Sequence, residues 1–129
     1  VTVTKHTLPL MQEGKIVNIS SIHGLLGHGR PSAAAYSALK AALENYTKNL
    51  AKDLAPKILV NAVAPGRVAT SMWGNPNIKE QEELGQAHLI RRMIQPGEIA
   101  DAIIFLVKND AMCGEVLTID GGMGLVTLG

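Results

Sequence analysis

Short apolar runs rich in β-branched residues alternate with longer amphipathic stretches along this chain. Three runs have the length of a strand, at residues 15–20, 58–64 and 115–120. Their nearly continuous apolar character is typical of parallel strands that helices cover on both faces. The alternation therefore predicts an α/β fold with three parallel strands and flanking helices.

Two helices are expected between these strands. The first is predicted to run from Ser32, as its N-cap, to about Leu54. Apolar residues repeat along it at intervals of three and four, and we expect this stripe to pack on another element: Leu39, Leu43, Tyr46, Leu50 and Leu54. The second helix is expected from about Pro96 to Val107, and it is apolar on most of its circumference, which predicts burial.

Two further segments depart from this simple pattern. Residues 71–92 are more polar and contain Gly74, Pro76 and Gly85, which predicts a lid-like loop with a short helix around residues 79–88. The strand at residues 15–20 is too apolar to form an exposed sheet edge. We therefore expect further strands, encoded before Val1 in a longer parent chain, to lie beside it.

Composition narrows the class of protein. The chain has 129 residues, of which 47% are hydrophobic, and its 12 Lys+Arg against 11 Asp+Glu give a net charge of +1. This balance excludes a disordered chain and argues against binding to nucleic acid. The single cysteine, Cys113, suits a reducing compartment such as the cytoplasm, and we expect it to be a small buried filler. No apolar run approaches the roughly 20 residues that cross a bilayer.

The candidate chemistry lies after the first strand. Tyr36 and Lys40 are four residues apart, so they share one helical face with about 5–6 Å between their Cβ atoms. An ammonium group beside a phenol favours the phenolate form, which suits proton transfer. Ser21 follows the first strand, at the sheet edge where α/β proteins bind ligands. These groups could converge on one substrate oxygen, although the same pair in an ordinary amphipathic helix is a packed ring beside a solvated amine.

Four motifs occur in a fixed order along the chain: Gly-Lys-Ile-Val-Asn-Ile-Ser-Ser at residues 14–21, Tyr-x-x-x-Lys at 36–40, Asn-Ala-Val-Ala-Pro-Gly at 61–66 and Asp-Gly-Gly at 120–122. Together they resemble the classical short-chain dehydrogenase/reductase family over nearly the whole sequence. The resemblance implies the C-terminal half of a doubly wound parallel-sheet Rossmann fold. It also implies an oxidoreductase that uses NAD or NADP to interconvert an alcohol and a carbonyl by hydride transfer.

The resemblance also assigns roles to individual residues. It implies that Ser21 is the catalytic serine, that Tyr36 is the acid/base, and that Lys40 tunes the tyrosine and holds the nicotinamide ribose. The remaining cofactor positions would be Pro65, Gly66, Val68 and Thr70. Substrate contacts would come from Ser21, His23, Arg67, Met72 and Trp73, although Trp73 also reads as a packing anchor of its loop.

The sequence departs from the family pattern at its beginning. Neither the glycine-rich turn that seats the ADP group nor the family's catalytic asparagine has a counterpart here, and the spacing from Ser21 to Tyr36 is slightly long. We therefore expect residues 1–129 to form a single partial domain without the dinucleotide-binding half, which binds cofactor poorly and is inactive alone. The choice between NAD and NADP would depend on a residue before Val1.

Three other functions have some support in the sequence: a metal site, acyl transfer and assembly without catalysis. His23 and His28 have no neighbouring Cys or Asp, so we expect no metal site. The Ser-x-x-Lys at residues 37–40 lacks the partner motifs of penicillin-binding enzymes. The main alternative is a non-catalytic assembly module, because alanines along the Ser32–Leu54 helix would let another helix approach closely. The resemblance itself implies a homo-oligomer formed through that helix.

Overall fold

The computed structural model describes residues 2–25, 32–74 and 76–125, and in it three parallel strands form one sheet. The strands are β1 (Gly14–Ile19), β2 (Ile58–Pro65) and β3 (Val116–Ile119), in the order β1-β2-β3. Gly14 pairs with Ile58 at one end of the sheet, and Pro65 pairs with Ile119 at the other. The predicted α/β class and the three parallel strands are confirmed, and each strand end lies within one residue of its predicted position.

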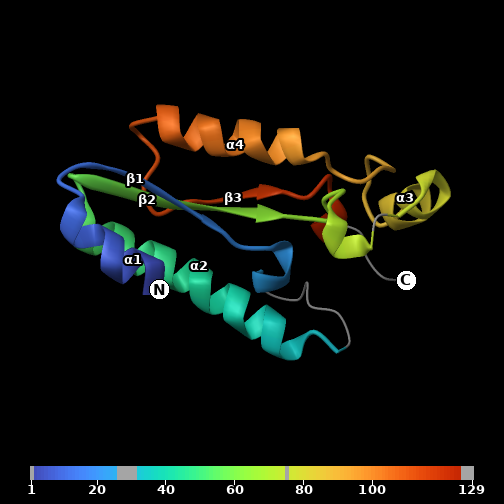
Figure 1. Cartoon of the computed structure of the whole chain (residues 1–129), viewed down its shortest axis with the longest axis horizontal. Helices are drawn as coiled ribbons and strands as arrows, with labels where there is room; N and C mark the ends of the chain where they lie inside the picture. The colour runs from blue at the N-terminus through green and yellow to red at the C-terminus, as the bar shows by residue number, and fades with distance from the viewer. Residues whose placement is uncertain (1, 26–31, 75, 126–129) are drawn as a thin grey trace.

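Helices cover both faces of this sheet. Helix α2 (Ala34–Leu54) connects β1 to β2 and lies on one face with the short helix α1 (Thr2–Thr7), whereas α4 (Pro96–Lys108) lies on the other face (Figure 1). The 3₁₀ turn η1 (Leu8–Leu10) follows α1 directly. The remaining elements gather near the carboxyl ends of the strands: η2 (Ile22–Gly24), η3 (Ser71–Trp73), α3 (Ile78–Gly85) and η4 (Met123–Leu125).

Each face of β2 has its own apolar core, because successive strand residues point to opposite sides. Val60 packs with Leu50 and Ala51 under α2. Val63 packs with Ile99 and Leu106 under α4. The central strand is therefore buried on both faces, which explains its continuous apolar sequence.

Helix α2 differs from its prediction in two respects. The helix begins at Ala34 with Ala33 as N-cap residue, and Ser32 has a φ of 66° in the preceding turn, so the predicted Ser32 N-cap is wrong. The helical line that meets the sheet carries Glu44, Thr47 and Ala51, which are buried. Leu39 lies beside that line and is 71% exposed. Of the apolar stripe, Tyr46, Leu50 and Leu54 pack in the core under α2.

Two burial predictions are also wrong. Helix α4 buries Ile99 and Leu106 but leaves Ile104, Phe105 and Val107 each 49% exposed, because the sheet covers only one side of it. Cys113 is exposed in the connection from α4 to β3. Among the described residues β1 is an edge strand, and a further strand beside it stays a prediction. The loop around His28 and Pro31 lies outside the described residues.

None of the described helices is long and apolar enough to cross a bilayer.

The core predicts a sharp contrast between two leucine truncations. Leu106→Ala should lower the free energy of unfolding by about 2–5 kcal/mol, because it removes a fully buried side chain and leaves a cavity. Leu10→Ala makes the same chemical change at a side chain that is 83% exposed, and it should change stability by about 0.5 kcal/mol or less. Urea denaturation of the two variants measures both values, and equal losses would contradict this description of the core.

Candidate active site

Three hydrogen bonds between α2 and β1 fix where the site residues lie; we refer to them as the α2–β1 seam. Their members lie at successive turns of α2 and at the end of β1: Asn18 Nδ2 donates to Thr47 Oγ1 (2.9 Å), Ser20 Oγ donates to Glu44 Oε1 (2.8 Å) and Lys40 Nζ donates to the Ile19 carbonyl (2.8 Å). Ser20, Glu44 and Thr47 are buried, and the Lys40 donor is charged. Hydrogen bonds of such groups are stronger than ordinary surface contacts. The seam therefore sets both the rotation of α2 and its position along β1.

Tyr36 lies one turn before Lys40 and shares its face of the helix, as the spacing predicts. The Lys40 ammonium is 5.6 Å from the centroid of the Tyr36 ring. The His23 ring meets the Tyr36 ring edge to face, with 5.6 Å between centroids. Lys40 and His23 thus position the phenol of Tyr36. Because Tyr36 is still 42% exposed, a ligand can reach it.

The two serines after β1 have different partners. The Ser20 hydroxyl is buried and bonded to Glu44 within the seam. Ser21 instead begins η2, and its Oγ accepts a hydrogen bond from the His23 backbone N–H (3.2 Å). Contacts thus lead from Ser21 to His23, and from His23 to Tyr36 and Lys40. Ser21 is joined to His23, and the role of Ser21 as the catalytic serine stays a prediction.

The remaining predicted cofactor positions lie at the end of β2 and in the loop that follows it, within residues 65–70. The Gly66 N–H donates to the Ile119 carbonyl (3.0 Å), which joins the ends of β2 and β3. A Cβ at Gly66 would lie 3.0 Å from Asp120 Cα, so any larger residue would force the neighbouring atoms to shift. Val68 forms a parallel bridge with Ile94 and is half-buried, whereas Thr70 is exposed. This loop is therefore tied to the sheet at its start and to Ile94 in its middle.

The predicted substrate residues beyond His23 form a second group. The Arg67 guanidinium lies over the Trp73 ring, 5.7 Å from its centroid, and Arg67 Nη1 donates to the Leu84 carbonyl (3.2 Å). These contacts connect the loop after β2 to η3 and α3, and Met72 beside them is 80% exposed. An open groove of about 440 Å³ separates η3 from α3, lined by Trp73, Gly74, Pro76, Glu80, Glu83 and Leu84. The site residues thus form two groups, one around Tyr36 and one around Arg67.

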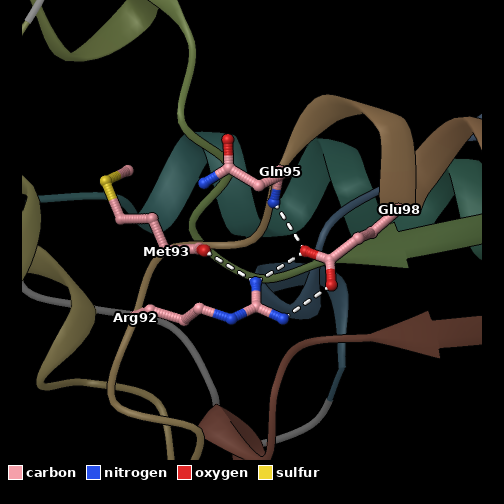
Figure 2. Close-up of polar contacts among 4 residues, drawn as sticks. All are labelled: Arg92, Met93, Gln95 and Glu98. Carbon is pink, nitrogen blue, oxygen red and sulfur yellow. Dashed lines mark hydrogen bonds and ion pairs between the residues drawn. The ribbon is translucent and has the colours of Figure 1, made fainter.

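A charged pair joins the end of the lid to α4. Arg92 Nη1 and Nη2 donate to the two carboxylate oxygens of Glu98, each at 2.7 Å, and Arg92 Nη1 also donates to the Met93 carbonyl (Figure 2). Glu98 Oε2 accepts the Gln95 N–H as well, which caps α4. The hydrogen bonds from Arg92 and then from the Gln95 backbone lower the pKa of Glu98 to about 2.

Sequence reasoning missed three of the residues that hold the site together. Glu44 is buried in the seam, Arg92 reads as solvated surface, and His88 is fully buried with Nε2 accepting the Arg67 N–H (3.1 Å). Their partners come from other elements or across a turn, so no short motif marks them. Within the described ranges, no cluster of three or more His, Cys, Asp or Glu side chains could hold a metal ion.

The Arg92–Glu98 pair predicts an unusual titration. In NMR spectra of the chain, the Glu98 carboxyl should titrate with a midpoint of about 2. Arg92→Gln should move that midpoint upward, but not fully to the ordinary value of 4.5, because the Gln95 N–H still favours the carboxylate. Since the folded pKa is depressed, the pair stabilises the fold above pH 4.5, and this contribution is lost as the pH falls toward 2. Lys108→Gln, which removes a positive charge from the far end of α4, is the control and should leave the Glu98 midpoint unchanged.

Comparison with known proteins gives a consistent result. Residues 1–124 match the family model described as enoyl-(acyl carrier protein) reductase. The chain is 38% identical over 114 residues to the short-chain dehydrogenase/reductase homolog YusR of Bacillus subtilis, which covers 88% of this chain and 86% of YusR. It is 41% identical over 116 residues to a 3-oxoacyl-[acyl-carrier-protein] reductase of Synechocystis, and 44% identical over 117 residues to a cyclopentanol dehydrogenase of Comamonas.

These relatives differ in how much of their length is matched. The alignment covers 87% of this chain and 45% of the Synechocystis reductase, and 85% of this chain and 45% of the Comamonas dehydrogenase. Apart from YusR, the chain therefore spans about half the length of these curated relatives. Among solved structures, a short-chain dehydrogenase family protein from Francisella tularensis superposes with a TM-score of 0.83 at 30% identity, over 96% of this chain and 57% of that one. ElxO with NADP bound superposes with a TM-score of 0.76 at 32% identity, over 96% of this chain and 51% of that one.

Proposed function

The chain belongs to the short-chain dehydrogenase/reductase family, and from this premise we propose that it interconverts an alcohol and a carbonyl, with Tyr36 as the acid/base. The homologues support NAD(P)-dependent oxidoreduction in general. The observation that carries the finer proposal is the placement of the Tyr36 ring, exposed to a ligand and flanked by Lys40 and His23 at the carboxyl edge of the sheet. That edge is where α/β sheets bind their ligands.

The residues fit the nicotinamide half of NAD or NADP. The Lys40 ammonium has three N–H donors, and its bond to the Ile19 carbonyl uses one of them. The other two would hold the ribose hydroxyls of the cofactor. After β2, Thr70 is exposed and Val68 is half-buried, and Ile94 holds their loop in place. This loop would offer a fixed surface to the nicotinamide ring. Pro65 and Gly66 would bring that loop close to the cofactor.

In the direction of carbonyl reduction, this chain's own groups would act on the substrate oxygen. The hydroxyls of Ser21 and Tyr36 would donate hydrogen bonds to that oxygen as negative charge develops on it. Tyr36 would then release its proton to the oxygen, and the positive charge of Lys40 would favour the phenolate that remains. When bound, the cofactor supplies the hydride. In alcohol oxidation the same groups act in reverse.

The substrate proposal is a small alcohol or ketone. His23 lies beside Tyr36, and Arg67, Met72 and Trp73, which form the second group, would contact the substrate from the side of the lid. Two relatives are named for compounds that carry a carbonyl or an alcohol, one a 3-oxoacyl-[acyl-carrier-protein] reductase and the other a cyclopentanol dehydrogenase. We propose that the lid residues select among carbonyl compounds, while the Tyr36 group acts on the carbonyl that they share.

Two features of the whole protein are also proposals. Residues 1–129 would form a partial domain whose activity needs the segment that seats the ADP group, since the chain spans about half of most curated relatives. A homo-oligomer would form through the Ser32–Leu54 region. The first half of α2 supports this, because it exposes Leu39 beside small residues: Ala34, Ala35, Ala38, Ala41 and Ala42.

Two tyrosines on α2 provide the test of catalysis. This chain would replace the matching segment of the Synechocystis 3-oxoacyl reductase, and the chimera would be assayed with NADPH and NADH on cyclopentanone and a 3-oxoacyl thioester. Tyr36→Phe should lower kcat/KM by about 10²–10⁴-fold, because the proton donor is lost. Tyr46→Phe removes the same hydroxyl from a ring packed against the core, and it should leave turnover nearly unchanged.

Assembly separates this proposal from the non-catalytic alternative. Size-exclusion chromatography should show the same oligomeric state for the chimera and for Tyr36→Phe. Turnover that survives Tyr36→Phe, or that falls equally in both variants, would contradict the role of Tyr36. A module that serves only in assembly would give a chimera with no turnover at all.

A further inference from the structure

His88 occupies a position where three parts of the site meet. Its side chain is fully buried between the ends of β2 and β3 and the last part of the lid. A Cβ on Gly66 would lie 3.0 Å from His88 Nε2, and a Cβ on Gly121 would lie 3.3 Å from His88 Cβ. Glycines thus follow both strands where the ring lies, and a side chain at either position would crowd it. Nε2 of this buried ring has a hydrogen-bond partner, whereas Nδ1 lies buried without one among the described residues.

The bond that His88 makes defines its protonation state. Nε2 accepts the backbone N–H of Arg67 (3.1 Å), and a backbone N–H can only donate. The imidazole is therefore neutral, with its proton on Nδ1. A proton added to Nε2 would remove the acceptor and place two N–H groups against each other. Neutral His88 can hold Arg67, whereas protonated His88 cannot.

The surroundings of His88 favour the neutral ring. Burial lowers its pKa below the ordinary 6.5, and the nearby positive charges of Arg67 and Arg92 lower it further. The Gly85 backbone and the Asp120 carboxylate act in the opposite direction without reversing the shift. These groups come from the loop after β2, from the lid and from the end of β3, which surround the ring. The Arg67 bond is therefore intact at neutral pH.

The Arg67 N–H lies at the start of the loop that we assign to the cofactor. Further along, the Ala69 N–H donates to the Ile94 carbonyl (2.8 Å), and the Ile94 N–H donates to the Arg67 carbonyl (3.0 Å). The loop is thus held by His88, by Ile94 and, at Gly66, by the Ile119 carbonyl, and among these only the His88 bond depends on a side chain that titrates. Loss of that bond would leave the other bonds in place and would loosen the loop at the Arg67 amide, next to Val68.

We propose that His88 is a positioning residue, which holds the Arg67 amide of the loop at residues 66–70 while it is neutral and releases that amide when it is protonated. Affinity for the nicotinamide cofactor would consequently fall on acidification. This consequence rests on the proposed function, because only that function assigns the loop to a cofactor. The clamp itself, meaning the His88 bond to the Arg67 amide, does not depend on it.

Amide hydrogen exchange of the chain tests the clamp without any cofactor. Protection of the Arg67 amide should be high at pH 8 and fall below pH 6.5, in step with protonation of His88 in NMR spectra. His88→Gln supplies a side-chain oxygen that can accept but does not titrate, so protection should persist at acidic pH. His88→Leu supplies no acceptor, so protection should be low at every pH. His6→Gln, on an exposed turn of α1, is the control and should change nothing.

The global stability of the fold gives a second readout. Since the folded pKa of His88 is lowered, the unfolded chain binds more protons below pH 6.5, and the folded state loses stability there. One such proton raises the unfolded-to-folded ratio by at most about tenfold for each pH unit. This part of the slope should be missing in His88→Gln. An Arg67 amide whose protection does not follow His88 protonation in the unmodified chain would overturn the proposal, even if both variants fail to fold.

The effect of His88 on cofactor binding is measured in the chimera with the Synechocystis reductase. His88→Leu should raise the KM for NADPH by about tenfold, which is the effect of one buried donor left unpaired, while kcat changes less than KM. If the Arg67 amide responds as expected but this KM does not, the clamp exists and its role in cofactor binding is wrong. Failure of the proposed function itself would be visible separately, as turnover that survives Tyr36→Phe.

Discussion

The hydrogen bonds between α2 and the end of β1 are the constraint on which the site depends. Asn18, Ser20 and the Ile19 carbonyl each bond to a different turn of α2. A helix that packs on a sheet through apolar contacts alone can slide or rotate with little penalty, whereas buried polar groups must keep their partners. The seam therefore fixes Lys40 over the end of β1 and carries Tyr36 with it, next to His23 and Ser21.

The same logic extends to the other half of the site. The loop after β2 is held by His88 and by Ile94, and the lid is joined to α4 through Arg92 and Glu98. The groups proposed to act on the substrate oxygen and the loop proposed to hold the cofactor are thus anchored independently. The α2–β1 seam contains no histidine, whereas the loop after β2 is held by one.

Local patterns made much of this predictable from sequence. The strands could be located because burial on both faces leaves continuous apolar runs, and each was found within one residue. Tyr36 and Lys40 could be paired because a spacing of four lies within one helix. Ser21 could be placed because parallel strands end at the same edge of the sheet. The family resemblance assigned roles to these residues, and their roles stay proposals.

Features that depend on distant partners were not predictable. The exposed Leu39 and the half-exposed Phe105 follow from which helical line meets the sheet, and the buried line of α2 contains Glu44 and Thr47, which no apolar stripe reveals. Ser32 precedes the helix because its backbone adopts a positive φ, which composition does not indicate. His88 lies in a polar segment, and no local pattern indicates that β2, β3 and the lid bury it.

Isotope transfer tests the central claim most directly, namely that the residues at this sheet edge support hydride transfer to a carbonyl. The chimera would be given cyclopentanone or a 3-oxoacyl thioester and reduced cofactor deuterated at C4 of the nicotinamide, and the alcohol would be analysed by mass spectrometry. The account predicts one deuterium on the carbinol carbon for each molecule of alcohol formed. Alcohol that contains no deuterium from either face of the nicotinamide, or a folded chimera that forms no alcohol, would contradict it.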